Sequence, residues 1–248
     1  MLKARIEARD LKEVVNTLLA LVDEANFEVA RDGVRTRAMD VSRIAMIMLE
    51  LPPSAFQDFD FAEEKAELGI NLDKVKEVLK GARASDIIEI SVPDPTMMEF
   101  AVGNVRRRIR LLAAEEAQTP KAPVFEFTAK AELFREEFMK FLNYADDISD
   151  HIVIEMKPGQ LRLYASGEGE MEEVELTLTE DQLPYIDVQE EARAMYTIEY
   201  IMAVMKAASS ADRVTLKIKT DHPMEMEFTV CRGAGTARFL LAPRISTT

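Results

Sequence analysis

The stretch KVKEVLKGARASD at residues 74–86 returns 126 residues later as YIMAVMKAASSAD at residues 200–212. In both copies apolar residues recur every three or four positions, which is the period of a helix with one buried face. The aligned pairs in which the residue is the same or similar are Val75 with Ile201, Val78 with Val204, Leu79 with Met205, Lys80 with Lys206, Ala82 with Ala208 and Asp86 with Asp212. A constant spacing over a whole helix indicates an internal repeat.

The repeat extends to both sides of this helix. Downstream, PTMMEF (95–100) aligns with PMEMEF (223–228), and RRIRLLA (107–113) aligns with TARFLLA (236–242). Upstream, DGVRTRAMD (32–40) aligns with PGQLRLYAS (158–166), and DLKEVVNTLLALVDE (10–24) aligns with AELFREEFMKFLNYADD (131–147). The segment AEEAQTPKAP (114–123) lacks periodicity and carries two prolines, as a connector does. We therefore expect two domains of like fold, at 1–113 and 124–248, joined by a connector at 114–123.

Each copy reads as short strands with two helices between them. Runs such as SRIAMIMLEL and DIIEISV are rich in β-branched and apolar residues and are separated by turn residues at short intervals, which is typical of antiparallel sheet. The helices must bury their apolar stripes against those sheets. The predicted fold class is therefore α+β, with two tandem similar domains, each of antiparallel sheets and two helices.

Composition limits the classes of protein to which the chain can belong. The chain has 248 residues, a formal net charge of −14 and a single cysteine, so an internal disulfide is excluded. No leader-like start and no apolar run of the roughly 20 residues that span a bilayer is seen. These features predict a soluble intracellular protein. The acidity disfavours a nucleic-acid-binding protein whose whole surface is positively charged. Because salt screens electrostatic fields beyond about 8 Å, a local basic surface remains compatible with the net negative charge.

Basic residues lie on the polar sides of the predicted helices. Lys76, Lys80 and Arg83 follow a helical spacing opposite the buried stripe of 72–82, and Lys12 and Lys140 lie on the polar sides of two other helices. A solvated face explains such residues when each helix is taken alone, because acids lie on the same helices. A surface directed at an anionic partner is the alternative.

Two strands carry charge of one sign. The last strand of the first copy contains Arg106, Arg107, Arg108 and Arg110, and GEGEMEEVELTL (167–178), interpreted as a central strand of the second copy, contains Glu168, Glu170, Glu172, Glu173 and Glu175. Charged edges commonly prevent unwanted strand pairing. Opposite charges would also favour pairing of these two edges between subunits, and such a head-to-tail contact closes into a ring or runs into a fibre.

The sequence carries no recognisable catalytic or metal motif. His151 and His222 are the only histidines, and neither they nor Cys231 have partners at a metal-ligand spacing. Phosphate-binding and nucleophile motifs are also missing. A metal-dependent phosphoryl-transfer enzyme that uses Asp146, Asp147 and Asp150 is a minor alternative, and a structural α+β oligomer that binds no nucleic acid is another.

Three segments together resemble the sliding clamps of archaea and eukaryotes, the proliferating cell nuclear antigen family. They are LVDEANFEVARDGVRTRAMDVSRIAMIMLELP (21–52), NLDKVKEVLKGA (71–82) and FLLAPRI (239–245), and the likeness is greatest to archaeal members and covers essentially the whole chain. The resemblance implies a two-domain chain that closes into a pseudo-sixfold trimeric ring around double-stranded DNA, without sequence specificity. It also implies a processivity factor with no catalytic residues, cofactor or metal of its own.

The resemblance assigns three sets of residues. The pore contacts to DNA would be Lys12, Lys76, Lys80, Lys140 and Lys206. The subunit interface would contain Arg83, Arg107, Arg108, Arg110, Leu142, Glu172, Glu173 and Glu175. The pocket for a partner's PIP-box-type peptide would be built by Met39, Ile44, Met46, Pro123, Pro223 and Leu240, with the backbone of Ala242, Pro243 and Ile245 pairing with the peptide.

The implied partners are a DNA polymerase, a clamp loader, a flap endonuclease and a DNA ligase, in the nucleoid-associated cytoplasm of an archaeal cell, with no membrane involved. The sequence departs from the family pattern at Val41, Leu19 and Met202, and in a tail that ends STT rather than in acids. Lys140 and Tyr144 also occupy positions where an interface acid is expected. A homotrimer and one subunit of a heterotrimeric or checkpoint-type clamp both remain open.

Overall fold

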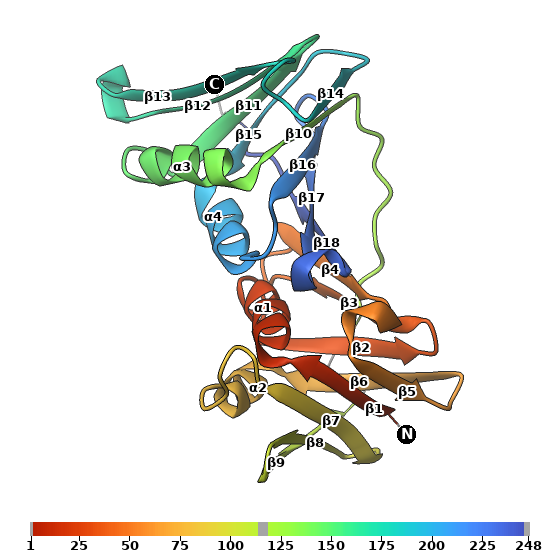
Figure 1. Cartoon of the computed structure of the whole chain (residues 1–248). Coiled ribbons are helices and arrows are strands. Elements are labelled where there is room, and N and C mark those ends of the chain that lie inside the picture. The colour runs from red at the N-terminus through yellow and green to blue at the C-terminus, as the bar shows by residue number, and fades with distance from the viewer. Residues whose placement is uncertain (1, 114–118, 246–248) are drawn as a thin grey trace.

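The fold consists of two halves that repeat the same order of elements, as the computed structural model shows for residues 2–113 and 119–245 (Figure 1). The first half contains β1 (Leu2–Glu7), α1 (Ala8–Leu19), β2 (Glu24–Ala30), β3 (Gly33–Met39), β4 (Ala45–Leu51), η1 (Pro53–Ala55), β5 (Asp58–Phe61), β6 (Lys65–Asn71), α2 (Leu72–Leu79), β7 (Ile87–Asp94), β8 (Met97–Val102) and β9 (Val105–Arg110). The second half contains β10 (Ala129–Phe134), α3 (Arg135–Asp146), β11 (His151–Lys157), β12 (Gln160–Ser166), η2 (Glu168–Glu170), β13 (Glu173–Thr179), β14 (Tyr185–Val188), β15 (Ala192–Thr197), α4 (Ile198–Ala207), β16 (Arg213–Ile218), β17 (Met224–Val230), η3 (Cys231–Gly233) and β18 (Gly235–Leu241).

The predicted fold class and repeat are confirmed, but the register of the last strands differs from the sequence alignment. Helices α2 and α4 begin at Leu72 and Ile198, at the predicted spacing. When the strand ladders of the two halves are matched pair by pair, Ile109 corresponds to Leu241, and not to Arg238 as the sequence alignment had it. Ile109 and Leu241 are both buried, whereas Arg238 is half-exposed. The alignment failed here because the hairpins before these strands differ in length.

The described part of the chain forms three antiparallel sheets. A five-stranded sheet has the order β5-β1-β7-β8-β9, and a four-stranded sheet has the order β13-β12-β11-β15. The third sheet has nine strands in the order β14-β10-β16-β17-β18-β4-β3-β2-β6, so it crosses from one half to the other. The crossing is the ladder between β18 and β4, from Thr236 opposite Glu50 to Leu241 opposite Ala45.

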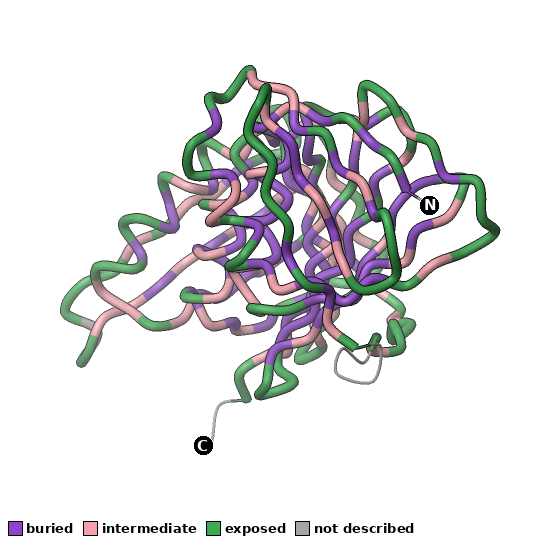
Figure 2. The backbone as a smooth tube through the Cα atoms, turned by 90° about the horizontal axis from the view of Figure 1, so that it is seen from below, coloured by how far each residue is buried: buried purple, intermediate pink, exposed green. Residues whose placement is uncertain are grey.

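The helices lie along one side of the sheets, in the spatial order α3, α4, α1, α2 (Figure 1). Their apolar stripes face the strands, and buried residues run through the interior while turns are exposed (Figure 2). Helix α2 begins where the side chain of Asn71 accepts a hydrogen bond from the backbone N–H of Lys74, which satisfies one of the free donors of a helix start. One face of each helix therefore remains available on the side away from the sheets.

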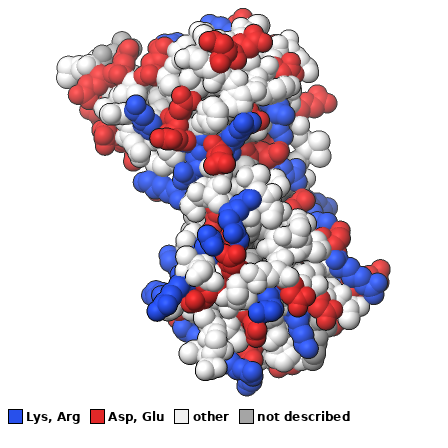
Figure 3. All heavy atoms as spheres, in the orientation of Figure 1, with Lys and Arg blue, Asp and Glu red and all other residues white. Residues whose placement is uncertain are grey.

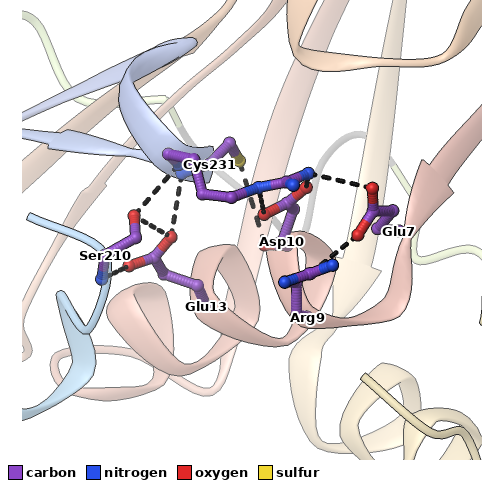
Figure 4. A network of polar contacts seen from close by, with 7 residues as sticks. Glu7, Arg9, Asp10, Glu13, Ser210 and Cys231 are labelled. Atoms are coloured by element: carbon purple, nitrogen blue, oxygen red, sulfur yellow. Dashed lines mark hydrogen bonds and ion pairs between the residues drawn. The ribbon is translucent and has the colours of Figure 1, made fainter. Parts of the chain in front are cut away.

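A buried carboxylate joins the two halves on the helix side. Glu13 of α1 is 4% exposed and accepts hydrogen bonds from the backbone N–H of Ser210 at 2.5 Å, the Ser210 hydroxyl at 2.7 Å and the backbone N–H of Cys231 at 2.8 Å. Asp10, also buried, pairs with the guanidinium of Arg232 at 2.6 Å. Figure 4 shows these side chains converging between α1 and the loops of the second half. Glu13 therefore belongs to the junction between the halves and not to a solvated helix face.

The C-terminal segment is fastened to the second half by an ion pair. Arg244 donates its backbone N–H to the carbonyl of Met195 at 2.7 Å, and its guanidinium lies 2.6 Å from Asp150 Oδ2. The Asp150 carboxylate also lies 2.7 Å from His151 Nδ1. The hydrogen bond from Arg244, followed by that from His151, lowers the pKa of Asp150 to about 2. This clasp fixes the position of residues 242–245.

Substituting Glu13→Ala should loosen the junction between the halves, because it leaves the half-buried N–H of Ser210 and the buried N–H of Cys231 without their acceptor. Each such group costs about 1–3 kcal/mol. Amide hydrogen exchange should become faster at Ser210 and Cys231, and the melting temperature should fall by several degrees. Glu64→Ala, at an exposed turn, is the matched control. Unchanged exchange at both amides would contradict this role for Glu13.

The Asp150 clasp should persist in mild acid. A carboxyl group whose pKa is depressed on folding contributes stability above its unfolded pKa near 3.8, and this contribution is lost as pH falls through the folded value of about 2. A carboxyl-carbon NMR titration should place Asp150 near the lower value, and Arg244→Gln should raise its pKa. The pKa of Asp32, which a hydrogen bond from Arg35 lowers, should stay unchanged in that variant. Titration of wild-type Asp150 near 3.8 would disprove the clasp.

Candidate functional site

Lysines occupy the exposed face of three helices. Lys76 of α2, Lys80 at its end, Lys140 of α3 and Lys206 of α4 are exposed and form no ion pair with another described residue. Basic side chains lie on the helix-bearing side of the molecule and over α2 and β9, while acidic ones gather around β12 and β13 at the other end (Figure 3). The four ammonium groups are therefore free to meet an anionic partner along this side.

Three other helix positions, Lys12, Met202 and Leu19, already contact the rest of the chain. Lys12 is half-buried, and its Nζ lies 2.5 Å from the carbonyl oxygen of Ala82, so its ammonium group already has an acceptor. Met202, the structural counterpart of Lys76, is 4% exposed and belongs to the buried core. Leu19 is partly buried against the core. These three positions contribute little to a basic surface.

The two charged strands are both sheet edges. Strand β9 ends the five-stranded sheet, and β13 ends the four-stranded sheet, so the interpretation of 167–178 as a central strand was wrong. Within the chain, Arg107 pairs with Glu77 at 2.8 Å and Arg108 with Glu99 at 2.6 Å, and Arg162 pairs with Glu175 at 2.7 Å. Glu173 forms no ion pair with a described residue. Each edge thus presents an unpaired backbone row with charge of one sign beside it.

Apolar side chains accompany both edges, and of these only Tyr144 was noted from the sequence, at a position where an interface acid was expected. Val105 on β9 is 69% exposed, and Tyr144 on α3, which packs against β13, is 56% exposed. Val174 and Leu176 of β13 are only partly buried, on the helix side of their strand. In the sequence, Val174 and Leu176 are marked by their alternation with the charged and polar residues of β13. Leu142, predicted at the subunit interface, is fully buried in the chain's own core, so that assignment is withdrawn.

A small apolar cluster lies on the outer face of the nine-stranded sheet, away from the helices. Met46 and Met48 of β4 and Leu240 of β18 are 3%, 4% and 5% exposed. Met39 and Phe125 pack against them, and Phe125 was not predicted. The cluster sits on the ladder that joins the two halves, where Met46 lies opposite both Met39 and Leu240.

Further apolar residues lie close along the chain to the strands and segments that carry this cluster. Val41 is fully exposed, Ile44 is 41% exposed and Ile245 is 84% exposed. Pro123 is exposed two residues before Phe125, and the half-buried Pro223 directly precedes β17. Together with the cluster, these residues form an apolar surface, which we call the outer pocket.

Backbone groups of the C-terminal segment are partly used within the chain, which corrects the predicted pairing of Ala242 to Ile245. The N–H of Ala242 donates to the carbonyl of Ile44 at 2.9 Å, and that of Arg244 donates to Met195. In an extended chain successive residues point their backbone groups to opposite sides. The carbonyl of Pro243 and the N–H and carbonyl of Ile245 are therefore the groups left for an added strand.

Neither metal nor membrane features were found in the part of the chain that the structure describes. No group of three or more His, Cys, Asp or Glu side chains there is placed to hold a metal ion. Asp150, one of the three acids considered for phosphoryl transfer, is engaged with Arg244 and His151. None of the helices is long and apolar enough to cross a bilayer.

Comparison with known proteins covers the whole chain. The family model for the N-terminal domain of proliferating cell nuclear antigen matches residues 1–110, and the model for its C-terminal domain matches residues 121–244. The DNA polymerase sliding clamp of Methanococcoides burtonii is 32% identical over 248 residues, which is 99% of each chain. That of Pyrococcus furiosus is 34% identical over 241 residues, which is 96% of each chain.

Solved structures agree with these matches. The A. fulgidus proliferating cell nuclear antigen, bound to the C-terminal region of FEN-1, superimposes with a TM-score of 0.94 at 26% identity over 100% of both chains. The Thermococcus kodakaraensis protein gives a TM-score of 0.88 at 26% identity, over 98% of this chain and 100% of that one. The resemblance seen in the sequence is confirmed, and the chain belongs to the proliferating cell nuclear antigen family.

Proposed function

We propose that this protein is a DNA sliding clamp, a processivity factor that closes as a homotrimer around duplex DNA and tethers replication and repair enzymes without catalysis of its own. The observation that carries the proposal is the relation between the two open edges and the ladder inside the chain. In the repeat, β9 is the counterpart of β18, and β13 is the counterpart of β4. Strands β18 and β4 pair within the chain, so β9 and β13 have the geometry to pair between chains.

The internal ladder also gives a register for the subunit contact. The paired strands of the two halves match Arg108 with Leu240 and Arg106 with Arg238. They also match Glu173 with Met46 and Glu175 with Met48. Because Leu240 lies opposite Met46 and Arg238 opposite Met48, the contact places Arg108 opposite Glu173 and Arg106 opposite Glu175. Opposite charges at facing positions favour this pairing over pairing of like edges.

The same register places Val105 opposite Leu176 on the helix side of the contact. Burying these partly exposed apolar side chains adds about 25 cal/mol per Å² of apolar area removed from water. Arg83, Arg107, Arg110 and Glu172 complete the proposed interface. A contact between different surfaces must close or grow into a fibre, and a trimer of two-domain chains gives a ring of six similar domains.

Both complementary edges belong to this one chain, which favours the homotrimer over the alternative of one subunit in a heterotrimeric or checkpoint-type clamp. A heterotrimer would require sister chains whose edges fit these better than this chain fits itself. The domain limits remain 1–113 and 124–248 in this proposal. Residues 114–118 of the connector and 246–248 of the tail lie outside the described residues.

Ring closure would turn the helix side of each chain toward the enclosed DNA. Lys76, Lys80, Lys140 and Lys206 would then meet backbone phosphates, which position a duplex without reading its sequence. Such contacts weaken steeply with salt, so each is weak and mobile. The ring would stay on DNA through topology, while the net charge of −14 would keep DNA from binding the outer surface.

The outer pocket would receive partner peptides. In the related A. fulgidus protein the bound partner is the C-terminal region of FEN-1, which supports a peptide of flap-endonuclease type as the occupant here. Apolar side chains of the peptide would contact Met39, Ile44, Met46 and Leu240 in the outer pocket. The peptide backbone would pair as a strand with Pro243 and Ile245. We propose the same site for a DNA polymerase, a clamp loader and a DNA ligase, in the nucleoid-associated cytoplasm of an archaeal cell.

The charge pairing at the subunit contact can be tested by exchange. Arg108→Glu should place like charges opposite Glu173 and lower the light-scattering mass from about three chains toward one at moderate salt. The double variant Arg108→Glu with Glu173→Arg should restore the trimer, because the pair is rebuilt with its signs reversed. Arg31→Glu, on a hairpin tip, is the control for added negative charge. If the double variant stays as dissociated as the single one, the register is wrong.

The pore lysines can be tested by the salt dependence of DNA binding. Replacing Lys76, Lys80 and Lys140 with alanine should weaken binding to a fluorescent 30-base-pair duplex in anisotropy measurements. The slope of log K against log salt should become shallower by about 0.9 for each phosphate that the variant no longer neutralises. Lys3→Ala, on the face of the five-stranded sheet away from the helices, should leave the slope unchanged. An unchanged slope in the triple variant would favour an oligomer that does not enclose DNA.

A further inference from the structure

Tyr200, in the first turn of helix α4, is hydrogen-bonded to Asp40 in the first half of the chain. Asp40 begins a loop that forms one side of the outer pocket. The hydroxyl of Tyr200 on α4 lies 3.1 Å from Oδ2 of Asp40, which begins the loop 40–44 that carries Ile44. We propose that Tyr200 is a positioning residue for the outer pocket, whose hydroxyl fixes the loop 40–44 and thereby the apolar side chain of Ile44. This inference rests on the proposed role of the pocket as a peptide site.

The Asp40 carboxylate organises the whole loop. Its Oδ1 accepts hydrogen bonds from the backbone N–H groups of Ile44 and Ala45, each at 2.8 Å. Its Oδ2 accepts from the N–H of Ser42 at 3.2 Å and from Tyr200. Three of these four donors belong to the loop or its exit, so they move with it. Tyr200 is the fourth, and it alone ties the carboxylate to an element anchored elsewhere.

The loop needs such an anchor because its backbone is strained and its apolar residues face water. Arg43 has a φ of 58°, a left-handed conformation that a residue with a side chain rarely adopts. Val41 is fully exposed and Ile44 is 41% exposed. The side chain of Val41 adds no packing that would hold the loop, so the hydrogen bonds to Asp40, together with the one from the N–H of Ala242 to the carbonyl of Ile44, hold it in place.

Tyr200 is suited to act as a permanent donor. Burial first, and the hydrogen bond to Asp40 second, raise the pKa of Tyr200 above its ordinary value near 10. The hydroxyl therefore keeps its proton at physiological pH and can donate it in the hydrogen bond to Asp40. The hydrogen bond joins a neutral donor to a buried carboxylate, an arrangement stronger than a bond between two neutral groups.

The other wall of the pocket is attached to the same turn of α4. Ile198, the first residue of α4, donates its N–H to the carbonyl of Asp150 at 3.0 Å, and the Asp150 carboxylate holds Arg244. The C-terminal segment in turn reaches Ile44 through the N–H of Ala242. Both walls are thus fixed before a peptide arrives, which lowers the ordering cost of binding.

The inference can be tested with a fluorescein-labelled peptide of the FEN-1 C-terminal region present in the A. fulgidus complex. Tyr200→Phe removes only the hydroxyl and should raise the Kd by about three- to tenfold, while the light-scattering mass and melting temperature stay unchanged. Tyr185→Phe is the matched control, because the Tyr185 ring is exposed on β14 and its hydroxyl bonds to no described residue. Amide exchange at Ser42 and Ile44 should become faster in Tyr200→Phe alone.

A double-mutant cycle separates positioning from general stability. If Tyr200 acts by placing Ile44, then Tyr200→Phe should have little further effect on the Kd in an Ile44→Ala background. Additive effects, or a Kd for Tyr200→Phe equal to wild type, would overturn the inference while leaving the pocket in place. Ile44→Asp should abolish binding with the ring intact. If the wild-type ring fails to bind the peptide, the proposed pocket itself fails, and the role of Tyr200 fails with it.

Discussion

The backbone ladder between β4 and β18 is the constraint on which the rest of the structure depends. It fuses half of each domain into one nine-stranded sheet, and this sets all four helices on the same side of the molecule. The buried carboxylates Glu13 and Asp10 lock that arrangement from the helix side, where α1 meets Ser210, Cys231 and Arg232. Two copies of one fold joined in this way leave the counterparts of the joined strands open at the far ends. A single chain thus carries both of the open edges, β9 and β13, that would pair in the proposed ring.

The β4–β18 ladder inside the chain and the proposed β9–β13 contact between chains occupy equivalent places in the fold, but the residues that face each other differ in charge. Inside the chain the facing pair is Leu240 with Met46, which is apolar and packed under Phe125. Between chains the corresponding pair would be Arg108 with Glu173, which is exposed in the single chain and whose contribution salt would reduce. An apolar ladder suits a junction that never opens, whereas an ionic one suits a junction that a loading enzyme must part. The exposed lysines on the helix side would follow the same logic in the proposed ring, because weak contacts to DNA would let it slide.

The outer pocket lies at the internal junction, so the proposed binding site for other proteins stands where the two domains meet. Its apolar cluster stands on β4 and β18, one wall is the loop organised by Asp40, and the other is the segment fastened by Arg244. Both walls lead back to the start of α4, whose far end carries the exposed Lys206. In the proposed ring, the peptide site on the outside and the wall that would face DNA therefore share one helix.

The sequence by itself determined the internal repeat, the α+β class, the helix positions and the opposite charge of two strands, because each of these follows from local periodicity and composition. The resemblance added the lysines at 76, 80, 140 and 206 and the pocket residues Met39, Met46 and Leu240. Only the tertiary structure decided that Glu13 is buried, that Leu142 lies in the core, that Lys12 is bound by a carbonyl and that β13 is an edge. It alone brought Tyr200 to Asp40, across 160 residues of chain. Such pairings depend on which strands share a ladder and on loop lengths that shift register, and no pattern of period 2 or 3.6 encodes contacts between segments so far apart.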